Sequence, residues 1–259
     1  MPAQRTVTWR RLARELHEAR RAGVPVAPLT SRTPDLDLEA AYQIQWEGIT
    51  LRLAEGESIV GGKLGFTSQA MRSAMGVDTP NYGWLTGSML VHDRTVELRR
   101  MIHPKAEPEI GFLLGSDLPS DCTAADVLEA TVVLFPCLEI VDSRYHDFRF
   151  EALDNIADNS SAGGLVVGDA ATSPRGIELA RVGVVLRVDG DVVETAAGGA
   201  VLDHPAKAVA WMARHARIRG LVAGDIVISG GLTRPVDLCP GMNLSVEIDR
   251  IGKARFRVD

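Results

Sequence analysis

Three glutamates stand in stretches that otherwise have the composition of buried strands. Glu107 and Glu109 are separated by one residue, and Glu139 lies within the apolar run 132–141. Alternate residues of a strand share a face, so Glu107 and Glu109 should point the same way, roughly 7 Å apart. The pattern therefore predicts acidic side chains at positions of a sheet where apolar side chains are expected.

Burying one ionised carboxylate is unfavourable, and carboxylates buried together raise each other's pKa. A hard cation such as Mg²⁺ or Mn²⁺ would neutralise them, because it takes oxygen ligands and keeps open positions for water or substrate. Two alternatives remain open on spacing alone. The glutamates face solvent from a half-exposed sheet, or they pair with Lys105 and Arg144.

A glycine-rich segment, residues 60–68, carries the single lysine Lys63. Its glycines allow close backbone approach, but the order and spacing do not match a phosphate-binding loop. Ser68 is predicted to cap a short helix that Gly76 ends, and Asp78 follows in a turn-rich, aromatic loop. Lys63 and Asp78 thus bracket one helix and can face the same pocket, although a lone charged residue in a loop is usually only solvated.

Composition limits the classes of protein. The chain has 259 residues, a formal net charge of −6 and 46% hydrophobic residues, which suits one large domain or two small ones. The acidic balance and the lack of a Lys/Arg tract argue against nucleic-acid binding. No apolar run approaches the ~20 residues of a membrane span, and no apolar signal core is present. Widely separated cysteines at 122, 137 and 239 favour a reduced, cytoplasmic protein.

Periodicity predicts helices early in the chain and strands later. Residues 8–22 and 37–56 read as amphipathic helices, so 1–58 is expected to form a helical arm. Residues 59–259 are expected to form a β-rich core, with the arm packed on it in one catalytic domain. Asp189-Gly190 predicts a hairpin turn, and Pro205 should begin a helix that continues through Arg217. A polar loop is expected at 158–164. This order favours an α+β fold.

Taken together, the motifs resemble the 2-oxopent-4-enoate hydratase and 4-oxalocrotonate decarboxylase family, within the fumarylacetoacetate hydrolase superfamily. The resemblance covers nearly the whole chain. It rests on ordered blocks around Lys63-Leu64-Gly65, Gly76-Val77-Asp78, Glu107-x-Glu109-Ile110, Leu138 to Arg144, Ile156 to Ser161, Gly199 to Trp211 and Gly224 to Val227.

The resemblance implies a mixed β-roll, one Mg²⁺ or Mn²⁺ and a homo-oligomer, with possible association with an enzyme of the same pathway. It implies that Glu107, Glu109 and Glu139 are the metal ligands. Lys63 would be catalytic, supported by Asp78. Leu64, Asp158, Asn159 and Ser161 would line the substrate pocket, whereas Lys105 and Arg144 are expected to be structural.

These groups suit the chemistry of a small 2-oxo acid or its 2-hydroxydienoate tautomer. A cation that binds the carboxylate and the C2 oxygen stabilises the enolate form, so that protons can move along the conjugated chain. Lys63 could assist at the C2 oxygen if the cation lowers its pKa. Once ketonisation has made C4 electrophilic, water can add there. A second carboxylate at the far end would instead permit loss of CO₂.

Sequence signatures divide between the two reactions. Segments 102–105, 142–150 and 230–233 resemble decarboxylases, whereas 107–115 and 160–164 resemble hydratases. No arginine closely follows Ser161 to hold a second carboxylate, so hydration is favoured. An acylpyruvate-type C–C hydrolase is a further alternative, for which the only local bases are His92 and His103. A non-catalytic partner subunit is another, against which the intact Lys63 and glutamates argue.

Overall fold

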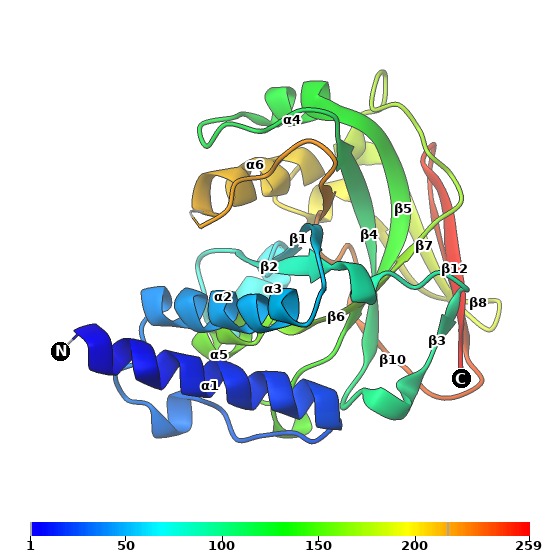
Figure 1. Cartoon of the computed structure of the whole chain (residues 1–259). Coiled ribbons are helices and arrows are strands. Elements are labelled where there is room, and N and C mark those ends of the chain that lie inside the picture. Colours follow the sequence, from blue (N-terminus) through cyan, green and yellow to red (C-terminus); the bar gives the residue numbers. More distant parts are fainter. Residues whose placement is uncertain (1, 217) are drawn as a thin grey trace.

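The computed structural model describes residues 2–216 and 218–259, with the backbone alone for residues 2–7 and Ala74. Helices occupy one side of the molecule and two sheets the other (Figure 1). The helix predicted to run from Pro205 through Arg217 is present as α6 (Pro205–His215). Its predicted last residue, Arg217, lies outside the described residues.

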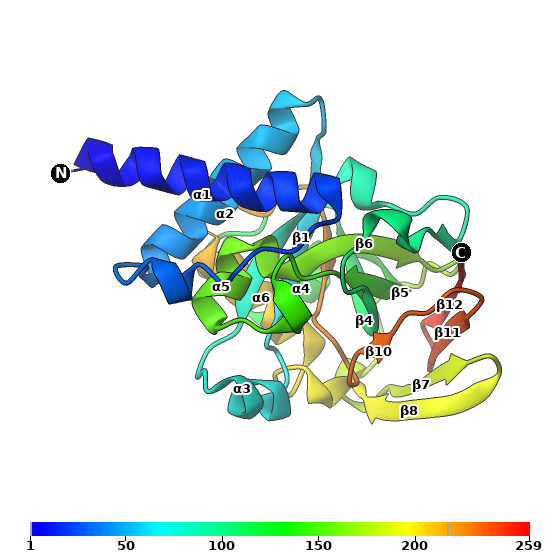
Figure 2. The same cartoon turned by 90° about the horizontal axis from the view of Figure 1, so that it is seen from below.

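The arm consists of α1 (Pro2–Ala22) and α2 (Leu38–Ala54), which lie against each other (Figure 2), and α2 also packs against the short α5 (Ala152–Ala157). The side chain of Asp37 caps α2 by accepting from Ala40 N at 2.8 Å, as the sequence predicts. Leu12 and Leu16 of α1 pack with Ile44 of α2 in a small apolar cluster. The arm therefore has a core of its own at its junction with the body.

The main sheet has seven strands. Its order is β2-β1-β9-β4-β5-β6, and β10 pairs with β4. Neighbouring strands are antiparallel, except that β1 and β9 are parallel. The bounds are β1 Ile59–Gly65, β2 Asn81–Thr86, β4 Lys105–Leu114, β5 Thr131–Val141, β6 Ala162–Val167, β9 Ile226–Ile228 and β10 Val236–Asp237.

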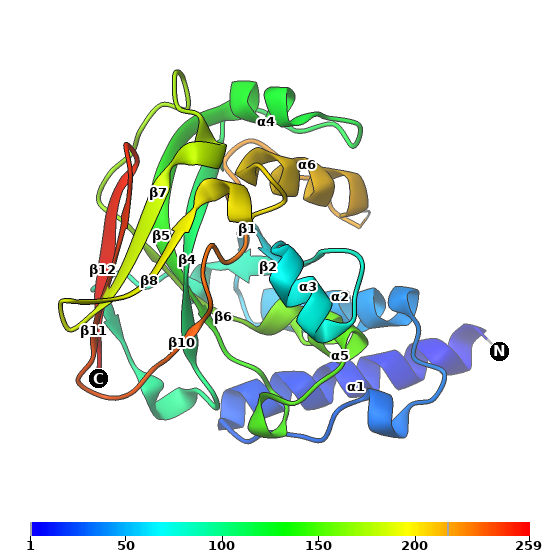
Figure 3. The same cartoon turned by 180° about the vertical axis from the view of Figure 1, so that it is seen from behind.

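A second sheet of five strands packs across β5, with the order β3-β12-β11-β7-β8 (Figure 3). Its bounds are β3 Thr95–Val96, β7 Gly183–Val188, β8 Asp191–Ala197, β11 Asn243–Ile248 and β12 Gly252–Val258. The hairpin between β7 and β8 turns at Asp189 and Gly190, whose φ values of 50° and 95° suit a tight turn. This confirms the predicted hairpin and the α+β class.

Two further short helices connect strands of the main sheet. The first is α3 (Gln69–Met75), capped by Ser68 and ended by Gly76 in the left-handed conformation, as predicted. The second, α4 (Ala124–Ala130), begins with a capping box made by Thr123 and Asp126. Helix α4 lies beside α6. No helix among the described residues is long and apolar enough to cross a membrane.

The prediction of a polar loop at 158–164 is wrong for residues 162–164, because β6 already begins at Ala162. The glycines there permit this pairing with β5. A Cβ atom at Gly163 would lie 2.9 Å from the carbonyl oxygen of Ile140, closer than side chains tolerate. Only Asp158 and the short turn Asn159–Ser161 separate α5 from the strand.

One buried amide joins the arm to the main sheet. Gln45 of α2 is 2% exposed and donates to the carbonyl oxygens of Tyr82 in β2 and Ile156 in α5, each at 2.8 Å. Gln45→Leu leaves both carbonyl groups without this donor, and we expect it to lower the free energy of unfolding by about 1–3 kcal/mol. Urea unfolding measures this. Gln43→Leu, the same change at an exposed position of the same helix, should cost far less. Equal losses would contradict the role of Gln45.

Candidate metal centre

The pairing of β4 with β5 brings the three glutamates together. Glu107 lies directly opposite Glu139 in the register, and Glu109 lies opposite Cys137. Side chains opposite or diagonal to one another across a strand pair share a face. One carboxylate oxygen from each of Glu107, Glu109 and Glu139 lies within 4.8 Å of the other two.

This cluster is buried without enough hydrogen-bond donors. Glu109 and Glu139 are fully buried, and Glu107 is partly exposed. Glu109 Oε2 accepts from Gly230 N at 2.7 Å, but Glu109 Oε1 and Glu139 Oε1 have no hydrogen-bond partner. Burial raises the pKa of Glu107 to about 7, and burial together with the neighbouring carboxylates raises the pKa of Glu109 well above its usual value.

A divalent cation fits this arrangement. Three carboxylates supply the hard oxygen donors that Mg²⁺ and Mn²⁺ take, and oxygens without partners are free to bind. Two glycines, Gly230 and Gly231, let their segment of the backbone pass close to the carboxylates. A Cβ at Gly231 would lie 2.8 Å from Glu107 Oε2, and Gly230 has φ of 96°. A larger residue at either position would strain the backbone or displace a carboxylate.

Lys63 extends from β1 into the same cluster. It is 2% exposed, and its Nζ lies 3.0 Å from Glu139 Oε2. Nζ also donates to the carbonyl oxygen of Ser160 at 3.0 Å and to its Oγ at 3.3 Å. Burial lowers the pKa of Lys63, but Glu139, Glu109 and Glu107 outweigh this, so that its pKa is raised. The chain alone thus holds Lys63 as an ammonium group beside the carboxylates.

The turn that presents Ser160 to Lys63 is strained. Asn159, Ser160 and Ser161 have φ values of 53°, 52° and 55°. This left-handed conformation is unfavourable for residues other than glycine, so surrounding contacts must maintain it. It also explains why Ser160 was missed. The sequence showed only a polar stretch, and the resemblance assigned Ser161, whereas the left-handed turn directs Ser160 to Lys63.

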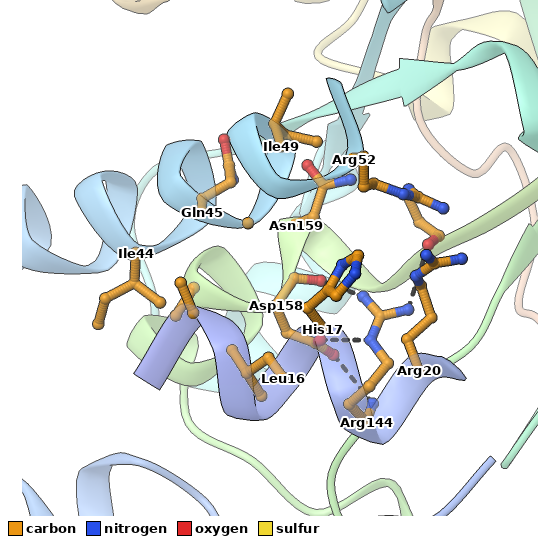
Figure 4. A pocket seen from close by; sticks show the side chains of 14 residues that line it. Leu16, His17, Arg20, Ile44, Gln45, Ile49, Arg52, Arg144, Asp158 and Asn159 are labelled. Carbon is orange, nitrogen blue, oxygen red and sulfur yellow. Dashed lines mark hydrogen bonds and ion pairs between the residues drawn. The ribbon is translucent and has the colours of Figure 1, made fainter. Parts of the chain in front are cut away.

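Arg144 holds both ends of this turn (Figure 4). Its side chain donates to the carboxylate and to the carbonyl oxygen of Asp158 before the turn, and to the carbonyl oxygen of Ala162 after it, at 3.2 Å. It also donates to the carbonyl oxygen of Asp142 at 2.6 Å. All three nitrogens of the guanidinium are therefore occupied, in keeping with the structural role that the sequence analysis expected.

The other residues assigned to the substrate pocket have protein partners. Asp158 and Asn159 line a small cavity between the arm and the core, which none of the three glutamates lines (Figure 4). The amide of Asn159 bonds the backbone of Trp84, accepting from N at 2.8 Å and donating to O at 2.9 Å. Ser161 Oγ accepts from Asn155 at 2.9 Å. Their contact with substrate stays a prediction.

Leu64 and Asp78 lie apart from the carboxylates in different ways. Leu64 follows Lys63 on β1, so its side chain points to the opposite face and belongs to the main apolar core. Asp78 is exposed in the loop between α3 and β2, and it forms no hydrogen bond or ion pair with another described residue. Its support of Lys63 also stays a prediction.

Comparison with known proteins now places the chain. The model of the family described as "Fumarylacetoacetate (FAA) hydrolase C-terminal" matches residues 62–259. The chain belongs to this family. The family and the β-roll fold predicted from sequence are thus confirmed.

Relatives of this family member carry two kinds of name. A 2-keto-4-pentenoate hydratase of Paraburkholderia xenovorans is 39% identical over 247 residues, covering 94% of this chain and 92% of that protein. A 4-oxalocrotonate decarboxylase of Pseudomonas sp. (strain CF600) is 38% identical over 225 residues, covering 85% of each chain. A solved 4-oxalocrotonate decarboxylase from Pseudomonas putida G7, complexed with magnesium and adipate, superposes with a TM-score of 0.93 at 34% identity, covering 100% of this chain and 98% of that chain.

Replacing one carboxylate should have opposite effects on the melting temperature with and without metal. The variant should be at least as stable as the wild type in a chelator, and less stable than the wild type in Mg²⁺. In a chelator, Glu109→Gln should melt at or above the wild-type temperature, because a neutral amide replaces a carboxyl group whose ionisation burial and the neighbouring carboxylates make unfavourable. With excess Mg²⁺ the wild type should melt higher, because a ligand that binds only the folded state stabilises it. Thermal melts with EDTA and with MgCl₂ measure this, and calorimetry measures Mg²⁺ affinity.

Glu97→Gln is the control, since Glu97 is an exposed glutamate paired with Arg99. It should leave both melting temperatures and the Mg²⁺ affinity unchanged. Glu109→Gln keeps the ion pair of Lys63 with Glu139, so the loss of metal binding would not be due to that pair. Mg²⁺ binding to Glu109→Gln as tight as to the wild type would refute this metal centre.

Proposed function

We propose that this chain is a divalent-metal-dependent lyase that hydrates a 2-hydroxy-2,4-dienoate to a 4-hydroxy-2-oxo acid, in one catalytic domain. The observation that supports it is the group of three buried carboxylates with unpartnered oxygens, joined by the buried ammonium of Lys63. The names of the relatives and the magnesium in the Pseudomonas putida G7 structure agree with this assignment.

Glu107, Glu109 and Glu139 would hold Mg²⁺ or Mn²⁺. A cation there supplies a Lewis acid for the carboxylate and the C2 oxygen of a 2-oxo acid. The protein's own contribution is to keep the three carboxylates together in a largely buried site. Fixed charges stabilise developing charge more strongly in such a site than in water.

Lys63 is the group best placed to act on the substrate's C2 oxygen. Its ammonium is held by Ser160 and Glu139, so it needs little reorganisation to donate a hydrogen bond. When the dienol loses its C2 hydroxyl proton and gains one at C5, negative charge builds on the C2 oxygen, and Lys63 would stabilise it. The resulting enone is electrophilic at C4, where water adds.

The remaining predicted site residues enter the proposal in supporting roles. Leu64 would fill the core behind Lys63, and Asp158, Asn159 and Ser161 would hold the turn beside the substrate. Asp78 is carried by the loop after α3, and its proposed support of Lys63 requires that this loop approach the site when substrate binds.

Hydration is favoured over decarboxylation because Arg144 and Arg72, two arginines that a second carboxylate could use, already have protein partners. Arg144 is fully engaged by Asp158 and by carbonyl groups. Arg72 donates to the carbonyl oxygens of Phe66 and Thr67 at 3.0 and 2.8 Å. A substrate with a charged far end would leave that charge unpaired in the pocket, which is unfavourable.

Decarboxylation of a 2-oxo-3-enedioate is the second candidate, and the close superposition on the Pseudomonas putida G7 decarboxylase favours it. A C–C hydrolase is less well supported. His92 is exposed, and the ring of His103 packs against Phe148 with a buried, unpartnered Nε2. The intact site likewise argues against a non-catalytic subunit.

We also propose that the chain forms a homo-oligomer, with possible association with an enzyme of the same pathway. The large apolar side chains left exposed on the described surface are compatible with contacts between subunits. They include Val132 at 55% exposed and, on the edge strand β8, Val192 at 50% and Val193 at 44%.

Substrate preference tests the proposal directly. With Mg²⁺, the protein should consume 2-hydroxypenta-2,4-dienoate, seen as loss of dienol absorbance, and release 4-hydroxy-2-oxopentanoate. With 2-oxohex-3-enedioate it should release little CO₂, because the pocket leaves the distal carboxylate unpaired. Absorbance, product mass and CO₂ release measure the two reactions. Rapid CO₂ release from the diacid without hydration of the monoacid would establish the decarboxylase instead.

Lys63→Ala tests the catalytic assignment. Loss of an electrostatic or proton-transfer group is expected to lower kcat on the order of 10²–10⁴-fold. Mg²⁺ should still bind, since the three carboxylates remain. Lys105→Ala is the control, because Lys105 also lies on a strand of the main sheet but pairs with Asp237 at 2.6 Å. A kcat for Lys63→Ala near that of Lys105→Ala would remove Lys63 from the mechanism.

A further inference from the structure

A chain of buried hydrogen bonds leads from Lys63 away from the carboxylates. Lys63 Nζ donates to Ser160 Oγ at 3.3 Å, and Ser160 Oγ donates to Asn81 Oδ1 at 2.9 Å. Asn81 Nδ2 donates to Asn155 Oδ1 at 2.7 Å, and Asn155 Nδ2 donates to Ser161 Oγ at 2.9 Å. All five residues are 3% exposed or less. Neither asparagine was singled out by the sequence.

The hydrogen bonds of this network all run in one donor-to-acceptor direction, which depends on how its two amides are oriented. An asparagine side chain offers donors at one end and an acceptor at the other. Because Asn81 donates to Asn155, its oxygen faces Ser160. The hydroxyl of Ser160 has one proton and gives it to Asn81, so only lone pairs remain to face Lys63. An ammonium group carries donors only, so Lys63 donates to these lone pairs and Ser160 accepts.

The backbone makes room for this contact. Gly65 of β1 pairs with Asn81 of β2, and a Cβ at Gly65 would lie 2.2 Å from Asn81 Oδ1 and 2.5 Å from Ser160 Oγ. Any other residue at Gly65 would push these two groups aside. Asn155 lies on α5, which packs against the arm helix α2. The hydrogen-bond network therefore connects the Lys63 ammonium on β1 to α5, a helix outside the sheet.

We propose that Asn81 and Asn155 are positioning residues, which orient the Ser160 hydroxyl so that it holds the Lys63 ammonium beside Glu139. The inference rests on the proposed function, in which Lys63 acts on the substrate. Asn81 acts through Ser160, and Asn155 acts through Asn81. A fully bonded buried network rigidifies its members, and a partly bonded one is unfavourable. Misplacing a catalytic group by about 1 Å lowers rates on the order of 100-fold.

A double-mutant cycle tests this route. Ser160→Ala removes the hydroxyl and keeps the carbonyl acceptor, whereas Asn81→Leu removes the group that orients the hydroxyl. Each is expected to lower kcat roughly 10- to 100-fold, and the double variant should be no slower than Ser160→Ala alone. Asn155→Leu should show a smaller loss in the same direction. Mg²⁺ affinity by calorimetry should stay at the wild-type value, because all three carboxylates remain.

Gln45→Leu is the matched control. It removes another buried amide whose partners, Tyr82 and Ile156, adjoin Asn81 and Asn155 in sequence. It should lose stability but keep kcat. Asn81→Ala, which removes less volume, replaces Asn81→Leu if the leucine variant does not fold.

Amine labelling gives a readout that needs no turnover. The chain has only four lysines, and Lys105, Lys207 and Lys253 have side chains 23%, 54% and 69% exposed. They serve as internal standards for modification by an acylating reagent, measured by mass spectrometry. Labelling of Lys63 should be slow in the wild type and in Gln45→Leu. It should rise severalfold in Asn81→Leu and Asn155→Leu, because the ammonium is no longer held.

The outcomes separate the two proposals. If the wild type turns over neither the dienoate nor the diacid, the proposed function fails, and the labelling rates alone decide the positioning role. If kcat losses of Ser160→Ala and Asn81→Leu multiply in the double variant, Asn81 does not act through Ser160, and the inference is overturned. Lys63 labelling in Asn81→Leu no faster than in Gln45→Leu overturns it as well.

Discussion

The rest of the site depends on mutual repulsion among three carboxylates inside the protein. Glu107, Glu109 and Glu139 bring up to three negative charges to one point, and the ammonium of Lys63 directly contacts one of them, Glu139. Ionised and without a cation, this group has excess negative charge that burial makes expensive. Raised carboxyl pKa values and oxygens without donors are two signs of the same imbalance. A divalent cation removes it.

The fold tolerates this imbalance because rigid elements carry the charges. Two glutamates lie on β4 and one on the adjacent β5, in the middle of a seven-stranded sheet, and Lys63 lies on β1 of the same sheet. Strand pairing fixes the separation of the carboxylates, so they cannot move apart to relieve their repulsion. The site is thus preorganised by backbone hydrogen bonds that a change of ligand does not disturb.

Less regular structure supplies the second half of the site. The turn of three left-handed residues at 159–161 is unfavourable by itself, and Arg144 compensates by bonding groups on both sides of it. Asn159 anchors the turn to β2 from another side. Strain at this point therefore brings Ser160 to Lys63, and buried polar contacts maintain the strain.

The sequence by itself determined the glutamate pattern, the helix caps at Asp37 and Ser68, the hairpin at Asp189 and the family. These depend on local spacing and on side-chain chemistry, which are readable along the chain. The fold class followed from the order of these elements. Even the carboxylate cluster was accessible, because alternation along a strand places Glu107 and Glu109 on one face.

Tertiary structure alone decided which polar residue meets Lys63. Ser160 and Ser161 are chemically alike and adjacent, and no spacing rule predicts three successive left-handed residues. Their conformation is imposed by Arg144 and by the start of β6 at Ala162, which are contacts made after the strands have paired. The roles of Asn81 and Asn155, 74 residues apart, were hidden for the same reason. Their amides meet only once β2 and α5 are brought together, and the preference of isolated residues carries no record of that contact.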